Sequence, residues 1–241
     1  MPRRTRSMLL TCGFLLAGLG CLAIGLDAQS PAVPKLNETW TRKGCVPAAS
    51  DLCPKITTFG IFRARAKAFK AAFDEIASPK YYCGQAGLPQ LLTDPYDFKI
   101  EQQADRLVFT YEQQDVVRTI WLEGHGHPKP SVYDFFTRGY STGRYEGNVL
   151  VVETTRFTFD PSGLDESNMP SSTQKRVVER YWREGDSLRV DVATEDPLFL
   201  LEPLKFSYEW TRSEREMLPY DCDPELARPP QHMIPSKYPD P

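Results

Sequence analysis

The sequence predicts a mainly β fold, an antiparallel up-and-down (calycin-like) β-barrel of about eight strands with one N-terminal amphipathic helix. From Tyr96 onward, hydrophobic and polar residues alternate with the period of two that is typical of strands. Short turns separate these runs, at 104–105, 146–148 and 184–186. A meander of this length closes most simply into a barrel, because closure removes exposed sheet edges. A two-sheet sandwich is the alternative.

Residues 1–28 have the features of a secretory signal peptide. Three arginines precede an apolar stretch from Met8 to Leu26, and Ala28 offers a cleavage point. We therefore expect a periplasmic or secreted protein with no stable membrane span after cleavage. An uncleaved anchor, or a lipoprotein attached at Cys21, is the alternative.

The composition excludes several classes of protein. The chain has 241 residues, of which 41% are hydrophobic and 25% are charged. These values exclude a coiled coil, a long disordered chain of one charge and a polytopic membrane protein. The net charge of −3 offers no basic face for nucleic acid, so no such partner is expected.

Four cysteines remain after removal of a signal peptide: Cys45, Cys53, Cys83 and Cys222. In an exported chain they predict two disulfides, and three pairings are open. We favour Cys45 with Cys53, which are close in sequence, and Cys83 with Cys222, which would tie the two ends of the main domain together. A zinc site is the alternative, but no C-x-x-C pair is present.

The Pro-rich segment 29–55 has no clear period and predicts an extended arm. The next segment, 56–77, predicts a helix, because hydrophobic residues recur at spacings of three and four. This stripe consists of Phe59, Phe62, Ala66, Phe69, Phe73 and Ile76. We expect it to pack on the outside or the open end of the barrel.

The strands of the barrel are expected in the domain 56–218. The clearest runs are 107–112, 116–122, 149–152, 177–182, 188–193 and 206–210. The two longer connections between them are 123–135 and 158–171. The tail 219–241 is rich in proline, so we expect it to form neither helix nor central strand and to wrap the surface.

Several motifs occur in a fixed order along residues 80–225. They include G-H-G-H-P at 124–128, S-T-G-R-Y-E-G-N-V-L-V-V-E-T at 141–154, E-R-Y at 179–181 and E-D-P at 195–197. This order resembles a large group of exported bacterial proteins with no assigned activity. Their pattern runs G-R-x-H-P, S-x-G-x-W-E-G-D-T-L-V-V-D-T, E-R-Y and E-D-P. The resemblance implies an exported barrel and gives no reaction. The chain departs from the pattern at His125, Tyr145 and Glu153.

Two of the three histidines, His125 and His127, lie in the sequence E-G-H-G-H-P that begins at Glu123. If the strand continues past Gly124, these three side chains point to one side. Two imidazoles and a carboxylate on one face are able to bind a divalent metal. The further Glu and His that a cupin adds are missing, so we expect no metal. Exposed histidines in a Gly/Pro-rich loop are the simplest alternative.

Charged residues interrupt the apolar strand runs. Glu179 and Arg180 lie mid-strand on opposite faces, so one of them should point into the barrel. Arg118 alternates with apolar residues and is also expected to point inward. Because a buried charge needs a partner, we expect an ion pair of Arg118 with Glu179, or of Arg180 with Glu153. If these charges are functional, they orient a polar group of a ligand.

The leading hypothesis for function is a barrel that binds one small, largely apolar or aromatic molecule in its interior. The aromatic residues expected to line the interior are Phe109, Tyr111, Trp121, Tyr181, Tyr208 and Trp210. The polar residues expected to contact the ligand are Arg118, His125, Glu179 and Arg180.

The second hypothesis is an acid–base enzyme without an organic cofactor: an isomerase, hydratase or lyase. His127 would donate and accept protons, and Glu123 would orient its imidazole. Tyr111 or Tyr181 would donate to a developing oxyanion. The third hypothesis is a structural protein of the cell envelope, which an exposed Phe stripe would favour.

Overall fold

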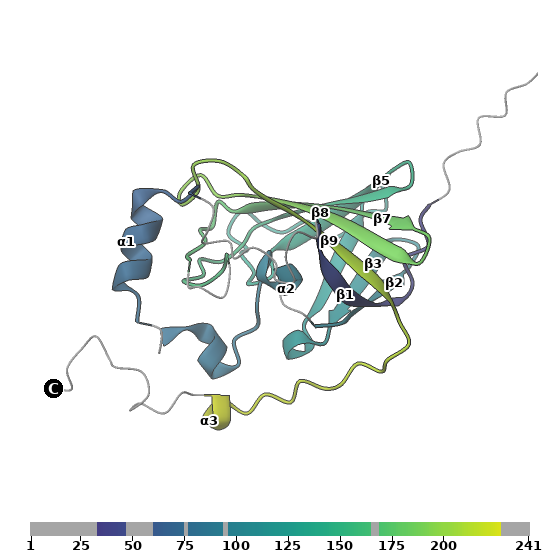
Figure 1. Cartoon of the computed structure of the whole chain (residues 1–241). Coiled ribbons are helices and arrows are strands. Elements are labelled where there is room, and N and C mark those ends of the chain that lie inside the picture. The colour runs from purple at the N-terminus through teal and green to yellow at the C-terminus, as the bar shows by residue number, and fades with distance from the viewer. Residues whose placement is uncertain (1–32, 47–59, 75–76, 94–95, 165–168, 228–241) are drawn as a thin grey trace, which may run out of the picture. The chain divides into compact units, whose positions relative to one another are not determined.

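The computed structural model describes residues 33–46, 60–74, 77–93, 96–164 and 169–227. Nine strands form a closed barrel in which each strand pairs with the next and β9 pairs with β1 (Figure 1). The strands are β1 (Thr39–Val46), β2 (Phe98–Gln102), β3 (Arg106–Tyr111), β4 (Val117–Leu122), β5 (Tyr140–Glu146), β6 (Val149–Thr155), β7 (Arg176–Glu184), β8 (Ser187–Glu195) and β9 (Leu204–Ser213). The helices are α1 (Ala64–Ala72), α2 (Gln90–Thr93) and α3 (Pro224–Ala227), with single 3-10 turns η3 (Pro79–Tyr82) and η4 (Gln113–Asp115).

The predicted barrel is confirmed, but it has nine strands, and one pair is parallel. The parallel pair is β4 with β5, where Ile120 lies opposite Ser141. A closed ring with an odd number of alternating strands must contain one such pair. Segment 123–139 makes it possible, because it crosses from the end of β4 to the start of β5 at the opposite end of the barrel.

The additional strand β1 comes from the Pro-rich segment that we expected to form an extended arm. It pairs with β9 from Thr39 to Val46 but with β2 only at Thr39 and Trp40. Trp40 is fully buried, so this segment contributes to the core as well as to the ladder. The sequence did not predict this strand, because few of its residues are apolar. Its conformation depends on pairing with β9 and β2.

The two ends of the barrel differ. We call one the hairpin end, because it carries the short turns 103–105, 147–148 and 185–186. We call the other the helix end, because α1 lies beside it with the longer connections 156–175 and 196–203 (Figure 1).

Helix α1 is shorter than the predicted helix 56–77. It begins at Ala64 and ends at Ala72, and the backbone of Phe73 is extended. Phe59 and Ile76, the outer members of the predicted stripe, lie outside the described residues.

The described part of the stripe is directed toward the helix end. Phe62 and Ala66 are buried in a second hydrophobic cluster with Leu200. The ring of Phe69 packs on that of Phe159, with 5.5 Å between their centroids. This burial counts against an interaction surface made by the stripe itself.

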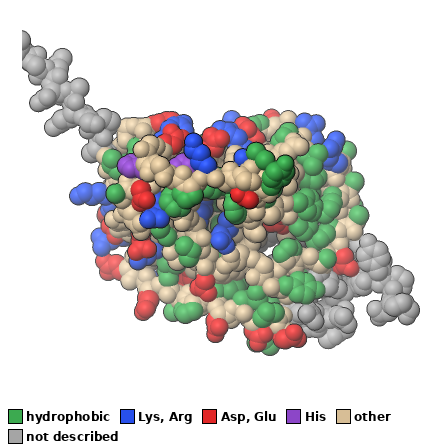
Figure 2. All heavy atoms as spheres, turned by 180° about the vertical axis from the view of Figure 1, so that it is seen from behind, with side chains coloured by type: hydrophobic (Ala, Val, Ile, Leu, Met, Phe, Trp, Pro, Cys, Tyr) green, Lys and Arg blue, Asp and Glu red, His purple; other side chains and the backbone are tan. Residues whose placement is uncertain are grey.

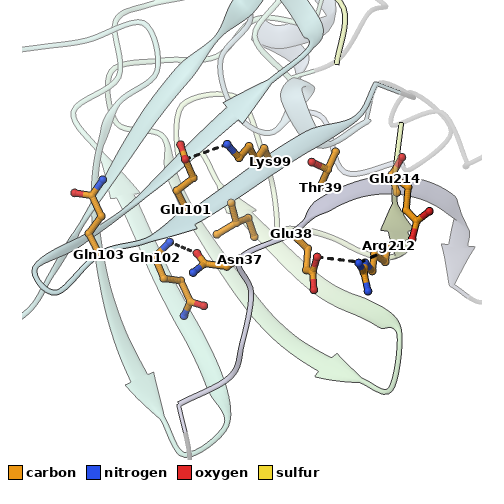
Figure 3. Close-up of a pocket in the computed structure, with 11 residues that line it drawn as sticks. Asn37, Glu38, Thr39, Lys99, Glu101, Gln102, Gln103, Arg212 and Glu214 are labelled. Atoms are coloured by element: carbon orange, nitrogen blue, oxygen red, sulfur yellow. Dashed lines mark hydrogen bonds and ion pairs between the residues drawn. The ribbon is translucent and has the colours of Figure 1, made fainter. Parts of the chain in front are cut away.

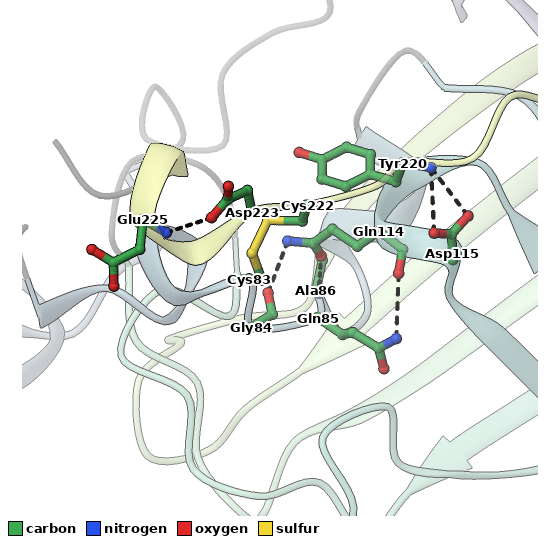
Figure 4. The surroundings of a disulfide bond; sticks show 10 residues. All are labelled: Cys83, Gly84, Gln85, Ala86, Gln114, Asp115, Tyr220, Cys222, Asp223 and Glu225. Atoms are coloured by element: carbon green, nitrogen blue, oxygen red, sulfur yellow. Dashed lines mark hydrogen bonds between the residues drawn. A yellow bond between two sulfur atoms is a disulfide. The ribbon is translucent and has the colours of Figure 1, made fainter.

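The disulfide Cys83–Cys222 is confirmed, with 5.9 Å between the two Cα atoms (Figure 4). Gln114 supports the segment that follows Cys83, because its side chain accepts from the backbone N–H of Ala86 and donates to the carbonyl of Gly84. The predicted pairing of Cys45 with Cys53 involves side chains outside the described residues.

The described part of the tail departs from its prediction in one respect. Pro224–Ala227 forms a helical turn, although we expected no helix there. Proline is tolerated in this place because the first turn of a helix needs no N–H donor. The carboxylate of Asp223 accepts from the backbone N–H of Glu225 and so caps the turn. None of the helices in the described ranges is long and apolar enough to cross a membrane.

Candidate ligand-binding site

A buried ion pair lies across the interior of the barrel. Arg118 points inward from β4 and is 3% exposed, and Glu179 points inward from β7 and is fully buried. Nη1 of Arg118 donates to Oε1 of Glu179 at 2.9 Å, and Nη2 donates to Oε2 at 2.5 Å. This bidentate geometry confirms the first of the two ion pairs that the sequence predicts.

Two hydroxyls on the strands between Arg118 and Glu179 complete this contact. Nε of Arg118 donates to Oγ of Ser141 at 2.9 Å, and Nη2 donates to Oγ1 of Thr154 at 2.8 Å. Tyr181 donates from its hydroxyl to Glu179. Strands β4, β5, β6 and β7 therefore each contribute to one network, which we call the Arg118 network.

Burial and the charges of the Arg118 network shift the pKa values of Arg118, Tyr111 and Tyr181. Burial alone would lower the pKa of Arg118, but the neighbouring Glu179 charge outweighs burial and raises it. Burial raises the pKa of Tyr111 to about 12, against the opposing effect of Arg118. Burial, followed by the charge of Glu179, raises the pKa of Tyr181 well above its usual value. Both phenols therefore stay neutral at physiological pH.

Aromatic rings fill the space around the Arg118 network. Phe98 stacks on Phe109 and Tyr111, with 5.9 and 5.4 Å between ring centroids, and packs edge-on against Trp210 at 5.5 Å. Phe109 packs edge-on against Tyr181 at 5.4 Å. All five side chains are at most 2% exposed. The interior next to the ion pair is thus occupied by side chains of the protein itself.

The structure divides the predicted ligand residues into two groups. Tyr111, Arg118, Glu179 and Tyr181 meet inside the barrel. Trp121 lies on the outer face, because it is an odd number of residues from Arg118 on the same strand. The expectation that Trp121 points inward is therefore wrong.

Arg180 also lies on the outer face of the barrel. Nη1 of Arg180 pairs with Glu146 at 2.9 Å. Glu153, the partner considered in the sequence analysis, pairs instead with Arg176 at 2.8 Å. The alternative pair of Arg180 with Glu153 is therefore not formed.

The strand does not continue through the histidine motif. β4 ends at Leu122, and Gly124 and Gly126 have φ values of +85° and +68°. These left-handed conformations break the alternation, so the expected common side for the histidines and Glu123 is lost. Among the described residues, no group of three His, Cys, Asp or Glu side chains has an arrangement that would hold a metal.

His127 belongs to a separate surface cluster. Its Nδ1 lies 2.5 Å from the hydroxyl of Tyr140, which donates to the carbonyl of Pro128. Its ring stacks on Trp121, with 6.3 Å between centroids. The carbonyl of Pro128 also lies 3.1 Å from this Nδ1, so Tyr140 and Pro128 contact the same ring nitrogen. Tyr140 therefore orients this imidazole, a role that we expected Glu123 to have.

Glu123 and His125 line a pocket of about 540 Å³ at the hairpin end, which we call the mouth pocket. Its apolar wall is formed by Val33, Ala104, Leu122 and the ring of Tyr145, and its polar groups come from Gln102, Gln103, Glu123, His125 and Arg144. The structure thus brings Glu123 and His125 together, while His127 and the buried Tyr181 lie in two other places.

The side chain of Gln102 lines the mouth pocket and hydrogen-bonds to two neighbouring segments. Its Oε1 accepts from the backbone N–H of Leu36 at 2.7 Å, and its Nε2 donates to the hydroxyl of Tyr145 at 3.0 Å. Leu36 is fully buried in the barrel core, so Gln102 connects the pocket lining to a segment that is anchored in the core. Burial raises the pKa of Tyr145, which keeps its hydroxyl protonated. Because that oxygen accepts from Gln102, its proton is able to donate to a ligand.

A second pocket, of about 560 Å³, lies over the seam of β1 with β2 and β9 (Figure 3). The charged groups that line it already pair with each other: Lys99 with Glu101 at 3.0 Å, and Arg212 with Glu38 at 3.3 Å. The lining of this pocket is almost entirely polar, with Ile100 as its apolar residue. The mouth pocket combines an apolar wall with polar groups that converge on one space, and it is the better candidate.

Sequence reasoning missed Ser141, Thr154 and Gln102. The first two belong to the motif 141–154, and Gln102 stands at the end of a strand. Alternation from Gly143 and Val152 would have placed both hydroxyls inside the barrel. No short-range sequence pattern predicts the contact of Gln102 with Leu36, because these residues are far apart in the sequence.

No family model and no curated protein matches the chain. Among solved structures, the chain is similar to a crystal structure of a "secretary abundant heat soluble (SAHS) protein" from Ramazzottius varieornatus. The two are 12% identical, and the match covers 76% of this chain and 99% of that chain with a TM-score of 0.36. At this TM-score the similarity supports no conclusion about function.

Proposed function

We propose that this protein is an exported barrel that binds a small aromatic or largely apolar molecule in the mouth pocket. The observation that carries the proposal is a concave space of about 540 Å³ with one apolar wall and a few polar groups. Volumes of roughly 300–1,000 Å³ and this mixture of surfaces are typical of ligand sites, which often lie in the mouths of barrels.

The packed interior favours the mouth pocket over the barrel core as the position of the ligand. The leading hypothesis from the sequence put it beside Arg118 and Tyr181, where rings and the ion pair now fill the space. In the mouth pocket, Tyr145 and Leu122 would contact the apolar body of the ligand. The Tyr145 hydroxyl and the His125 imidazole would bind its polar group.

Two features support export. The disulfide Cys83–Cys222 is typical of an oxidising compartment. The N-terminal segment 1–28 has the sequence pattern of a signal peptide, and its structure lies outside the described residues.

A fluorescence titration tests the binding proposal. N-phenyl-1-naphthylamine, a neutral aromatic probe that brightens in apolar surroundings, should bind with a stoichiometry of one. Ala104→Trp should weaken binding at least tenfold, because an indole at this exposed turn position would fill the pocket.

His127→Ala is the matched control for His125→Ala, because His127 stacks on Trp121 outside the residues that line the pocket. We expect His125→Ala to weaken binding and His127→Ala to leave it unchanged. Equal binding by the wild type and Ala104→Trp would refute the mouth pocket as the site.

A further inference from the structure

Five large apolar side chains are exposed on two neighbouring segments at the helix end. We call them the aromatic patch: Val132 (68% exposed), Tyr133 (87%), Phe135 (44%), Phe136 (41%) and Phe159 (47%). Single exposed apolar residues are ordinary, but a group of this size marks an interaction surface.

Hydrogen bonds hold the aromatic patch in place. The backbone N–H of Ser131 donates to the carboxylate of Asp134 at 2.7 Å, which forms a tight turn. The N–H of Phe136 donates to the carbonyl of Arg156 at 2.8 Å, and the N–H of Thr158 donates to the carbonyl of Phe136 at 3.0 Å. The patch is therefore ordered before any partner arrives, which lowers the entropy lost on binding.

Helix α1 borders the aromatic patch and is strongly basic. Residues 60–73 contain four basic residues and no acidic residue. Ala66 faces the core, and Arg65 and Lys67 on either side of it are exposed. Lys70 follows one turn later. Among the described residues, no carboxylate forms an ion pair with Arg65, Lys67 or Lys70.

One contact joins the basic helix to the aromatic patch. Phe159, a member of the patch, packs against Phe69 of α1 with 5.5 Å between centroids. Phe157, two residues earlier, forms a β-bridge with Phe136. Figure 2, in which the helix end lies on the right, shows hydrophobic side chains in green beside Lys and Arg in blue in this region. The basic and aromatic groups thus form parts of one surface.

We propose that the aromatic patch and the basic side chains of α1 (Arg65, Lys67 and Lys70) together bind the surface of an anionic phospholipid membrane. Aromatic side chains favour the interface between headgroups and acyl chains, and Lys and Arg bind acidic headgroups. The local charge supports this partner, because three cations lie on one short helix of a chain whose net charge is −3. A purely apolar partner would not account for these cations.

Vesicle sedimentation tests the proposal with the chain purified from an exporting host. The protein should sediment with phosphatidylcholine vesicles that contain phosphatidylglycerol and should stay in the supernatant with pure phosphatidylcholine. High salt should release it, because screening weakens the attraction between the cations and the headgroups. The blocked variant Ala104→Trp should bind vesicles normally, so this test and the ligand test fail independently.

The triple variant Arg65→Gln, Lys67→Gln, Lys70→Gln should reduce the partition coefficient at least about tenfold, since each cation near an anionic surface strengthens binding by roughly fivefold. The matched control removes three other exposed lysines, Lys35→Gln, Lys43→Gln and Lys99→Gln, and should bind nearly as well as the wild type.

Tyr133→Ser with Phe135→Ser tests the aromatic part. Both side chains are exposed, so the fold should survive and circular dichroism should be unchanged. Leu226→Ser, at a position that is 84% exposed, is the control. Loss of sedimentation in the double variant alone supports the proposal. Equal binding to neutral and anionic vesicles would overturn it. A dimer in light scattering that the double variant abolishes, without vesicle binding, would overturn it as well.

Discussion

The Glu179→Gln variant should destabilise the protein by about 3–5 kcal/mol, because it leaves the Arg118 guanidinium buried without a counter-ion. Arg118 is 3% exposed and donates two of its four hydrogen bonds to Glu179. Two unit charges about 4 Å apart attract each other by about 4 kcal/mol at an effective dielectric constant of ~20. The amide of Gln keeps the shape of the side chain, so the loss measures the missing charge.

The free energy of unfolding in urea, with the disulfide intact, is the quantity to measure. Glu153→Gln is the matched control, because it breaks the half-exposed pair with Arg176 and should cost less than about 1 kcal/mol. The double variant Arg118→Met, Glu179→Leu should be more stable than Glu179→Gln, since it removes both charges. A cost below about 1 kcal/mol for Glu179→Gln would refute the view that Arg118 and Glu179 are closed off from solvent by the surrounding side chains.

Three further predictions concern stability. Burial lowers the pKa of Lys175 from 10.5 to about 8. The unfolded chain therefore binds this proton more tightly than the folded protein does. Below pH 8 the charged side chain costs the folded protein about 3 kcal/mol of stability. Lys175→Met should therefore be more stable at pH 7 in urea unfolding, and its advantage should shrink as the pH rises from about 8 to 10.5. Cys222→Ser should lower the free energy of unfolding by about 4 kcal/mol, because it removes a link to Cys83 that spans 139 residues. Equal urea midpoints for the oxidised and the reduced wild type would contradict this prediction. Gly139→Ala should lower the melting temperature more than Gly185→Ala, because both have positive φ but only the former would place a Cβ 2.6 Å from a neighbouring side chain.

The strands that carry alternating residues were predictable from the sequence, and those that do not were missed. β3, β7 and β8 alternate clearly, and the structure shows which of their faces is buried. β1 has few apolar positions, and its ladder with β9 forms only when the two ends of the chain meet. Local patterns do not encode such long-range pairing.

The ion pair was predictable for the same reason. Arg118 and Glu179 each alternate with apolar residues, and a buried charge requires a partner. The arrangement of the histidine motif was not predictable in this way, because Gly124 and Gly126 adopt left-handed conformations that end the alternation. The mouth pocket was also beyond sequence reasoning, since Gln102 and Tyr145 meet there only through tertiary contacts.

Nuclear magnetic resonance of the labelled protein, titrated with N-phenyl-1-naphthylamine, tests the central claim most directly. Binding in the mouth pocket predicts chemical-shift changes at the backbone amides of Gln102, Leu122 and Tyr145, which line it. The amides of Phe109 and Tyr181, next to the closed interior, should not shift. Changes centred on Phe109 and Tyr181 would contradict the account, because the ligand would then lie among the rings of the barrel core.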